Sequence, residues 1–159
     1  FFLVGMAGLL TSLLDLRGQE EIIKMPVPSS RTIILLDTSA SMLAEDVRPS
    51  RLKKSLLIAK HFARKAAGQQ ISVIAFSEVH KKIIPFTTDL DLIDSRLDSL
   101  GDLKNHYGSS ALSLALQESV QYFKDVNTSG AANILVLTDG EETAKTIKVN
   151  IPSYIKVAF

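Results

Sequence analysis

Two carboxylates and several hydroxyl groups stand next to apolar runs in this sequence, and their types suit the binding of a metal ion. Asp37, Ser39 and Ser41 occupy "DTSAS" directly after one apolar run, and Asp139 follows another in "LVLTDGEE". Ser110 lies in "GSS", ahead of a helical pattern, with Ser109 as the alternative hydroxyl there. Carboxylate and hydroxyl oxygens are the ligands that hard divalent cations prefer. We therefore predict a site for Mg²⁺, or for Mn²⁺ or Ca²⁺, with these five residues as its ligands.

Each of these residues has an ordinary structural explanation as well. An aspartate at the end of a strand, such as Asp37, often tightens a loop, and Asp139-Gly140 is a common turn dipeptide. The two serines of "DTSAS" suit a turn, and Ser109 or Ser110 is a favourable N-cap for the helix that follows. The functional interpretation therefore depends on the ordered set as a whole and not on any single member.

The apolar pattern around these residues alternates between strands and helices. The strong strands are continuous apolar runs, which is typical of parallel strands covered by helices on both faces. The chain is thus expected to form an α/β fold, a Rossmann-like doubly wound, mostly parallel sheet flanked by helices. Pro85 cannot donate to a strand ladder, so its strand is expected at a sheet edge. Strands are predicted at 32–37, 70–76, 81–86, 133–140 and 154–159, and helices at 51–68, 87–100 (with Thr88 as N-cap) and 109–124.

This fold would bring the candidate ligands together. In a doubly wound sheet, ligands bind beyond the carboxyl ends of the strands, at the point where the strand order reverses. The first and fourth predicted strands are neighbours across that point in the commonest order, so Asp37 and Asp139 are expected side by side. The loop "NHYGSSAL", which carries Ser110, is expected at the same edge.

The composition restricts the classes of function. The chain has 159 residues, of which 46% are apolar, and this is enough for one domain with a sizeable core. Its net charge is +1, with 18 basic and 17 acidic residues, so no nucleic-acid partner is predicted. There is no cysteine, which excludes disulfides and zinc sites built on cysteine.

The first residues form an uncharged stretch, "FFLVGMAGLLTSLL". As a helix, its 14 residues would span about 21 Å, against about 30 Å for a bilayer core. We predict a partial transmembrane helix at 1–16, a linker at 17–30, and a domain at 31–159 that is truncated at its C-terminal end. A signal-peptide core and a buried helix are the alternatives. The first would call for a basic n-region, which is missing, and a surface helix would show a polar face.

The motifs resemble the metal-ion-dependent adhesion site of von Willebrand factor A (VWA) domains. That family's pattern is D-x-S-x-S, then a threonine in a later loop, then an aspartate after the fourth strand. "DTSAS" matches the first part and "LVLTDGEE" the last, while "GSSAL" places Ser110 where many members have threonine. The resemblance implies the VWA fold, a divalent cation on the five residues named above, and a partner protein that supplies an Asp or Glu to the metal.

Longer stretches, "SMLAEDVRPSRL" and "PFTTDLDLI", resemble VWA proteins of the bacterial aerotolerance (Bat) type. This resemblance implies anchoring in the bacterial inner (cytoplasmic) membrane through the N-terminal segment. It also implies association with a MoxR-type AAA+ ATPase and with other VWA proteins, in stress tolerance or complex maturation.

The sequence thus predicts a metal-dependent protein-interaction module at a membrane, and neither an enzyme nor any catalytic residue. A VWA-fold scaffold that does not use the metal, and a metal-assisted hydrolase, are the alternatives. Against the hydrolase, Ser39 stands where a phosphohydrolase of the haloacid-dehalogenase type needs a second aspartate, and there is no G-x-S-x-G elbow. His106 lies near "GSS", but no nucleophile, base and orienting group can be assembled around it.

Overall fold

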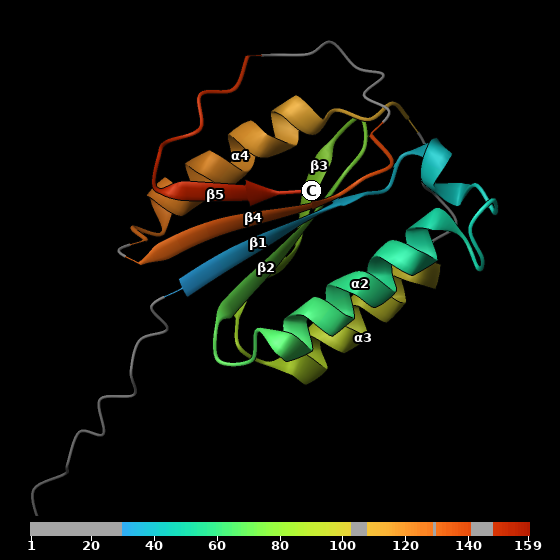
Figure 1. The fold of residues 1–159 in the computed structure, drawn as a ribbon, viewed down its shortest axis with the longest axis horizontal. Helices are drawn as coiled ribbons and strands as arrows, with labels where there is room; N and C mark the ends of the chain where they lie inside the picture. Colours follow the sequence, from blue (N-terminus) through green and yellow to red (C-terminus); the bar gives the residue numbers. More distant parts are fainter. Residues whose placement is uncertain (1–29, 103–107, 129, 141–147) are drawn as a thin grey trace, which may run out of the picture.

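The described part of the chain forms a five-stranded sheet in the order β3-β2-β1-β4-β5 (Figure 1). The computed structural model describes residues 30–102, 108–128, 130–140 and 148–159. Four strands are parallel, and β3 pairs with β2 in the antiparallel direction. The elements are β1 (Ser30–Asp37), the 3₁₀ helix η1 (Ala40–Leu43), α2 (Arg51–Lys65), β2 (Gln70–Phe76), β3 (His80–Thr87), α3 (Leu90–Asp102), α4 (Leu112–Asp125), β4 (Ala131–Leu137) and β5 (Ile155–Ala158).

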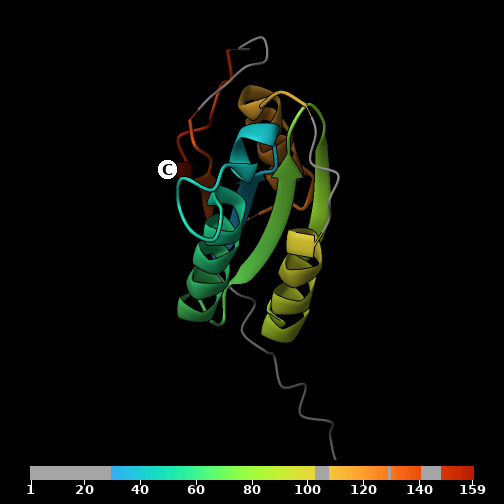
Figure 2. The ribbon, with the colours of Figure 1, turned by 90° about the vertical axis from the view of Figure 1, so that its right-hand side faces the viewer.

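The sheet is covered on both faces, as Figures 1 and 2 show, with α2 and α3 on one side and α4 on the other. The central strand β1 explains this arrangement, because its alternate side chains enter different cores. Ile34 and Leu36 pack with α2 and α3, while Ile33 and Leu35 pack with α4. The predicted doubly wound α/β fold is therefore confirmed, and so is the reason given for it, a continuous apolar run buried on both faces.

The strand order also confirms two predictions that matter for the site. β1 lies between β2 and β4, so the first and fourth strands are neighbours and the strand order reverses beside β1. β3, which carries Pro85, is an edge strand. Several bounds differ from the prediction by one to three residues, and the two that matter here are the ends of α2, at Lys65, and of β4, at Leu137. Thr138, Asp139 and Gly140 consequently belong to the loop after β4.

The helix starts show how local hydrogen bonding sets the bounds. Ser50 caps α2, since its Oγ accepts a hydrogen bond from the backbone N–H of Lys53 at 3.2 Å. The prediction of Thr88 as the N-cap of α3 is wrong. Asp89 fills that role, because its Oδ1 accepts from the backbone N–H of Leu92 at 3.0 Å. A carboxylate at this position also favours the positive end of the helix dipole.

The predicted membrane helix at 1–16 and the linker, apart from its last residue, lie outside the described residues. Ser30, the last residue assigned to the linker, already begins β1. In the part of the chain that the structure describes, none of the helices has both the length and the apolar character needed to cross a membrane.

The packing of α3 gives a stability prediction. Leu97 is fully buried in the core between α2, α3 and the sheet, whereas Leu92 on the same helix is 37% exposed. We expect Leu97→Ala to lower the free energy of unfolding by about 2–5 kcal/mol, because it leaves a cavity. Leu92→Ala, the matched control, should change it by only about 0.5 kcal/mol. Urea unfolding of both variants measures the difference, and equal losses would contradict this packing.

Candidate metal centre

The candidate ligands follow two parallel strands that end side by side. β1 and β4 pair up to Leu36 and Leu137, so Asp37, the last residue of β1, and the loop that begins at Thr138 lie at the same edge of the sheet. The end of β2 lies there too, since the backbone N–H of Thr38 donates to the carbonyl of Phe76 at 2.8 Å. This is the carboxyl edge at which open α/β sheets bind their ligands.

The Asp37 carboxylate is the centre of the arrangement, and it is 0% exposed. Its Oδ1 accepts a hydrogen bond from the backbone N–H of Ser39 at 2.8 Å. Its Oδ2 accepts from the hydroxyls of Ser110 at 3.0 Å and Thr138 at 2.7 Å. Three segments far apart in the sequence thus converge on one buried carboxylate.

Ser39 and Ser41 lie together on the turn that follows Asp37. Their Oγ atoms are 3.1 Å apart, and Ser39 is buried while Ser41 is half-buried. The 3₁₀ turn of η1 produces this proximity, because the backbone N–H of Met42 bonds back to the carbonyl of Ser39. Ser39 is the N-cap residue of η1 but its side chain does not cap the helix. Its hydroxyl instead meets that of Ser41.

Ser110 does not act as a helix cap. The N-cap residue of α4 is Ala111, which makes no side-chain capping bond, and the Ser110 hydroxyl donates to Asp37. The interpretation of Ser110 as an N-cap is therefore wrong. The backbone of this loop is held at the sheet edge, since the N–H of Ala111 donates to the carbonyl of Ser77 at 3.0 Å.

Asp139 has a different environment from Asp37. Its side chain is 8% exposed and forms an ion pair with Arg51, whose Nη1 lies 2.9 Å from Oδ2. Four of the five predicted ligands, Asp37, Ser39, Ser41 and Ser110, are joined by contacts around Asp37. Asp139 is adjacent in sequence to Thr138, which contacts Asp37. The assignment of these residues as metal ligands stays a prediction.

Sequence reasoning missed two residues of this centre. Thr138 donates to Asp37 and also accepts from the backbone N–H of Gly140 at 3.1 Å. Its only signal was its place between an apolar run and Asp139. Arg51 is the first residue of α2, where the helix dipole disfavours a cation, and that mismatch was the available signal.

The donor set fits a hard divalent cation. Asp37 takes part in none of the ion pairs among the described residues, although it is fully buried. A buried carboxylate without a counter-ion is costly, so its surroundings favour a cation. Within the described residues, no group of three or more His, Asp or Glu side chains is placed to hold a metal ion. Any metal here would therefore depend on two carboxylates, hydroxyls and water, a ligand set that suits Mg²⁺.

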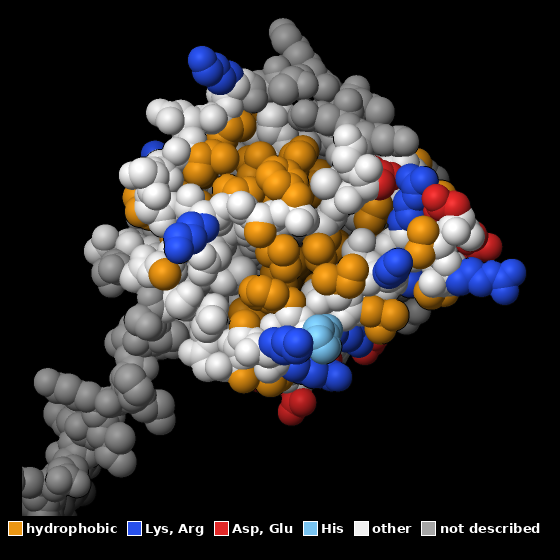
Figure 3. Space-filling view, in the orientation of Figure 1, with side chains coloured by type: hydrophobic (Ala, Val, Ile, Leu, Met, Phe, Trp, Pro, Cys, Tyr) orange, Lys and Arg blue, Asp and Glu red, His pale blue; other side chains and the backbone are white. Residues whose placement is uncertain are grey.

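A pocket of about 350 Å³ opens beside Asp139. Arg51 and Lys54 give it positive charge, and Figure 3 shows acidic and basic side chains gathered at the edge of the molecule where α2 begins. Its full lining is Met42, Val47, Arg51, Lys54, Ser55, Ile58, Thr138 and Asp139.

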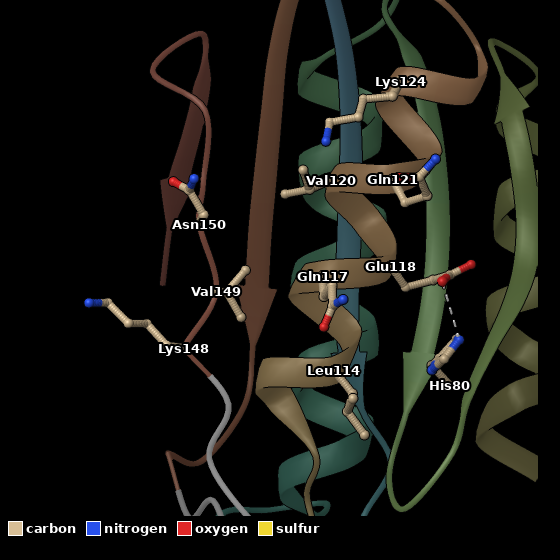
Figure 4. A pocket seen from close by; sticks show the side chains of 10 residues that line it. All are labelled: His80, Leu114, Gln117, Glu118, Val120, Gln121, Lys124, Lys148, Val149 and Asn150. Carbon is tan, nitrogen blue, oxygen red and sulfur yellow. Dashed lines mark ion pairs between the residues drawn. The ribbon is translucent and has the colours of Figure 1, made fainter.

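A larger pocket, of about 560 Å³, lies between α4 and residues 148–150 (Figure 4). His80 and Glu118 face each other at its rim, with Nε2 and Oε2 3.7 Å apart. None of the five predicted ligands lines it. Of the five predicted ligands, Asp139 is the one that lines the pocket of about 350 Å³.

Comparison with known proteins supports this fold. The family model of the von Willebrand factor type A domain matches residues 32–142. A UPF0353 protein of Mycobacterium tuberculosis is 29% identical over 126 residues, which cover 76% of this chain and 38% of that protein. An uncharacterized protein of Borreliella burgdorferi is 30% identical over 132 residues, with 79% and 38% covered. The chain thus spans less than half the length of these curated relatives.

Two solved structures extend the comparison. An aerotolerance-related membrane protein from Bacteroides fragilis superposes with a TM-score of 0.64 at 28% identity, covering 73% of this chain and 57% of that one. The manganese-loaded TRAP protein of Plasmodium vivax gives a TM-score of 0.63 at 16% identity, covering 73% and 48%. At that identity the second likeness concerns the fold alone.

The hydrogen bonds to Asp37 generate a stability prediction. Thr138→Val keeps the shape of the side chain but removes a donor to a buried charged acceptor, so it should lower the free energy of unfolding by about 1.5–3 kcal/mol. Thr38→Val is the matched control, because the Thr38 hydroxyl donates to the neutral carbonyl of Phe76 at 3.0 Å. Its cost should be about 0.5–1.5 kcal/mol. Urea unfolding in the presence of a chelator compares them, and an equal or larger loss in Thr38→Val would refute the central role of Asp37.

Proposed function

Because the chain belongs to the von Willebrand factor type A domain family, we propose that it is a metal-dependent protein-interaction module. Asp37, Ser39, Ser41, Ser110 and Asp139 hold the divalent cation in this proposal. The observation that carries it is the buried Asp37 carboxylate, which receives three hydrogen bonds and has no counter-ion among the described residues.

Each residue has a physical task in this role. The donors Ser39, Ser110 and Thr138 hold the Asp37 carboxylate in one orientation, so that it does not have to be ordered when a cation arrives. The paired hydroxyls of Ser39 and Ser41 add neutral ligands, which leave the positive charge of the cation largely uncompensated. When bound, the metal supplies a point of positive charge that can accept a carboxylate at an open coordination position.

The partner is accordingly a protein that presents an Asp or Glu. The resemblance to Bat proteins extends the proposal to a MoxR-type AAA+ ATPase and other VWA proteins, in a stress-tolerance or complex-maturation system. We place the protein at the bacterial inner membrane, anchored through residues 1–16. The description of the Bacteroides fragilis neighbour as an aerotolerance-related membrane protein supports this part of the proposal.

A scaffold that does not use a metal is the second candidate function, and one observation favours it. Arg51 already neutralises Asp139, one of the two carboxylates that a divalent cation would need. The two candidates differ in a simple measurable property, the affinity of the chain for Mg²⁺ or Mn²⁺ at millimolar concentration.

Isothermal titration of the chain with Mn²⁺ and Mg²⁺ tests the proposal. Wild type should bind one ion, and Asp37→Ala should weaken binding by more than about 100-fold, since losing an outer-shell partner alone costs about 10–100-fold. Asp98→Ala is the control, because Asp98 is an exposed carboxylate on α3 that pairs with Lys60. It should bind like wild type. Absence of binding by wild type, or unchanged binding by Asp37→Ala, would refute the metal-dependent module.

A further inference from the structure

Arg51 bridges two carboxylates of very different exposure. Its Nη1 lies 2.9 Å from Oδ2 of Asp139, whose side chain is 8% exposed. Its Nη2 lies 2.8 Å from Oδ2 of Asp46, which is 52% exposed, and its Nε lies 3.0 Å from Oδ1 of Asp46. Asp46 thus holds the guanidinium by two parallel hydrogen bonds, and Asp139 holds it by one.

The position of Arg51 is unfavourable without these partners. It is the first residue of α2, and the first turn of that helix contains no acidic residue to balance the positive end of the dipole. The hydrogen bonds from Asp46 and then Asp139 raise the pKa of Arg51 above its ordinary value, and the bond to Arg51 lowers the pKa of Asp46. The two ion pairs with Asp46 and Asp139 therefore stabilise the guanidinium in this position.

One of these carboxylates is also a proposed metal ligand. A guanidinium on Asp139 cancels negative charge that a divalent cation would use, and two positive charges on one carboxylate repel each other. A cation at the centre and Arg51 on Asp139 are consequently in competition. When its single bond to Asp139 is lost, Arg51 can keep its two hydrogen bonds to Asp46.

We propose that Arg51 is an internal competitor of the metal, pairing with Asp139 in the metal-free chain and retaining only Asp46 once the site is filled. The inference rests on the proposed function. Arg51 and Asp139 both line the pocket of about 350 Å³, together with Met42, Val47 and Ile58. Filling the site thus rearranges the charges on a surface next to the one that meets the partner, which couples metal occupancy to that surface.

Three variants test the competition by titration with Mn²⁺. Arg51→Gln should bind Mn²⁺ about tenfold more tightly than wild type, because a repelling charge is removed. Asp46→Asn should bind more weakly, since Arg51 then has Asp139 alone, and it should have no effect when combined with Arg51→Gln. Arg64→Gln is the matched control, because Arg64 lies on the same helix and pairs with Asp94 away from the site. It should leave the affinity unchanged.

Two readouts follow Arg51 itself. In chelator, Arg51→Gln should have a lower melting temperature than wild type, because Asp139 loses its ion pair with Arg51. In saturating Mn²⁺, the melting temperatures of the two proteins should become equal. In wild type, the side-chain ¹⁵N NMR signal of Arg51 should shift during Mg²⁺ titration while that of Arg64 stays in place.

The outcomes separate this inference from the proposed function. Metal binding by wild type, with equal or weaker binding by Arg51→Gln, would overturn the competition and leave the metal site intact. An Arg51 signal that does not respond to bound Mg²⁺ would do the same. If neither wild type nor Arg51→Gln binds metal, the proposed function falls, and the competition falls with it.

Discussion

The buried carboxylate of Asp37 is the interaction on which the arrangement of this sheet edge depends. A charge that is 0% exposed must receive hydrogen bonds from the protein, because water does not reach it. Its donors come from the turn after β1, the loop before α4 and the loop after β4, at Ser39, Ser110 and Thr138. One desolvated group thus joins three loops that are far apart in the sequence. The polarity of those loops follows from the same requirement.

The parallel sheet makes this convergence possible. β2, β1 and β4 run in the same direction, so their carboxyl ends meet at one edge, and the backbone ties the loops to it. Thr38 bonds to the carbonyl of Phe76, and Ala111 bonds to that of Ser77, both at the end of β2. The loop before α4 is therefore held at this edge by a backbone contact as well as by the Ser110 side chain. Ser110 needs only to point its hydroxyl at Asp37.

The fold and the proximity of Asp37, Ser39, Ser41 and Ser110 could be predicted because they depend on simple patterns. Buried parallel strands appear in the sequence as continuous apolar runs, and ligands of such sheets bind beyond the carboxyl ends of the strands. The misses have local and long-range causes. The predicted N-cap of α3, Thr88, lies one residue before the observed one, Asp89. Thr and Asp are both favourable N-caps, and the sequence alone does not show at which of the two residues the backbone becomes helical. Arg51 and Asp139 are 88 residues apart, and the periodicity of apolar residues does not predict an ion pair across that separation.

The two carboxylates of the centre are held in opposite ways, and this difference shapes what the site can do. Among the described residues, the hydrogen bonds that Asp37 receives come from neutral donors alone, while Asp139 shares the Arg51 guanidinium with Asp46. Without a metal, Arg51 therefore offsets only part of the negative charge at Asp139. If a divalent cation bound while Arg51 stayed nearby on Asp46, repulsion between the two positive charges would weaken the binding of the metal. Under the proposed function, Arg51 at this helix start would thus lower the affinity for the metal while adding positive charge beside the position offered to an acidic partner.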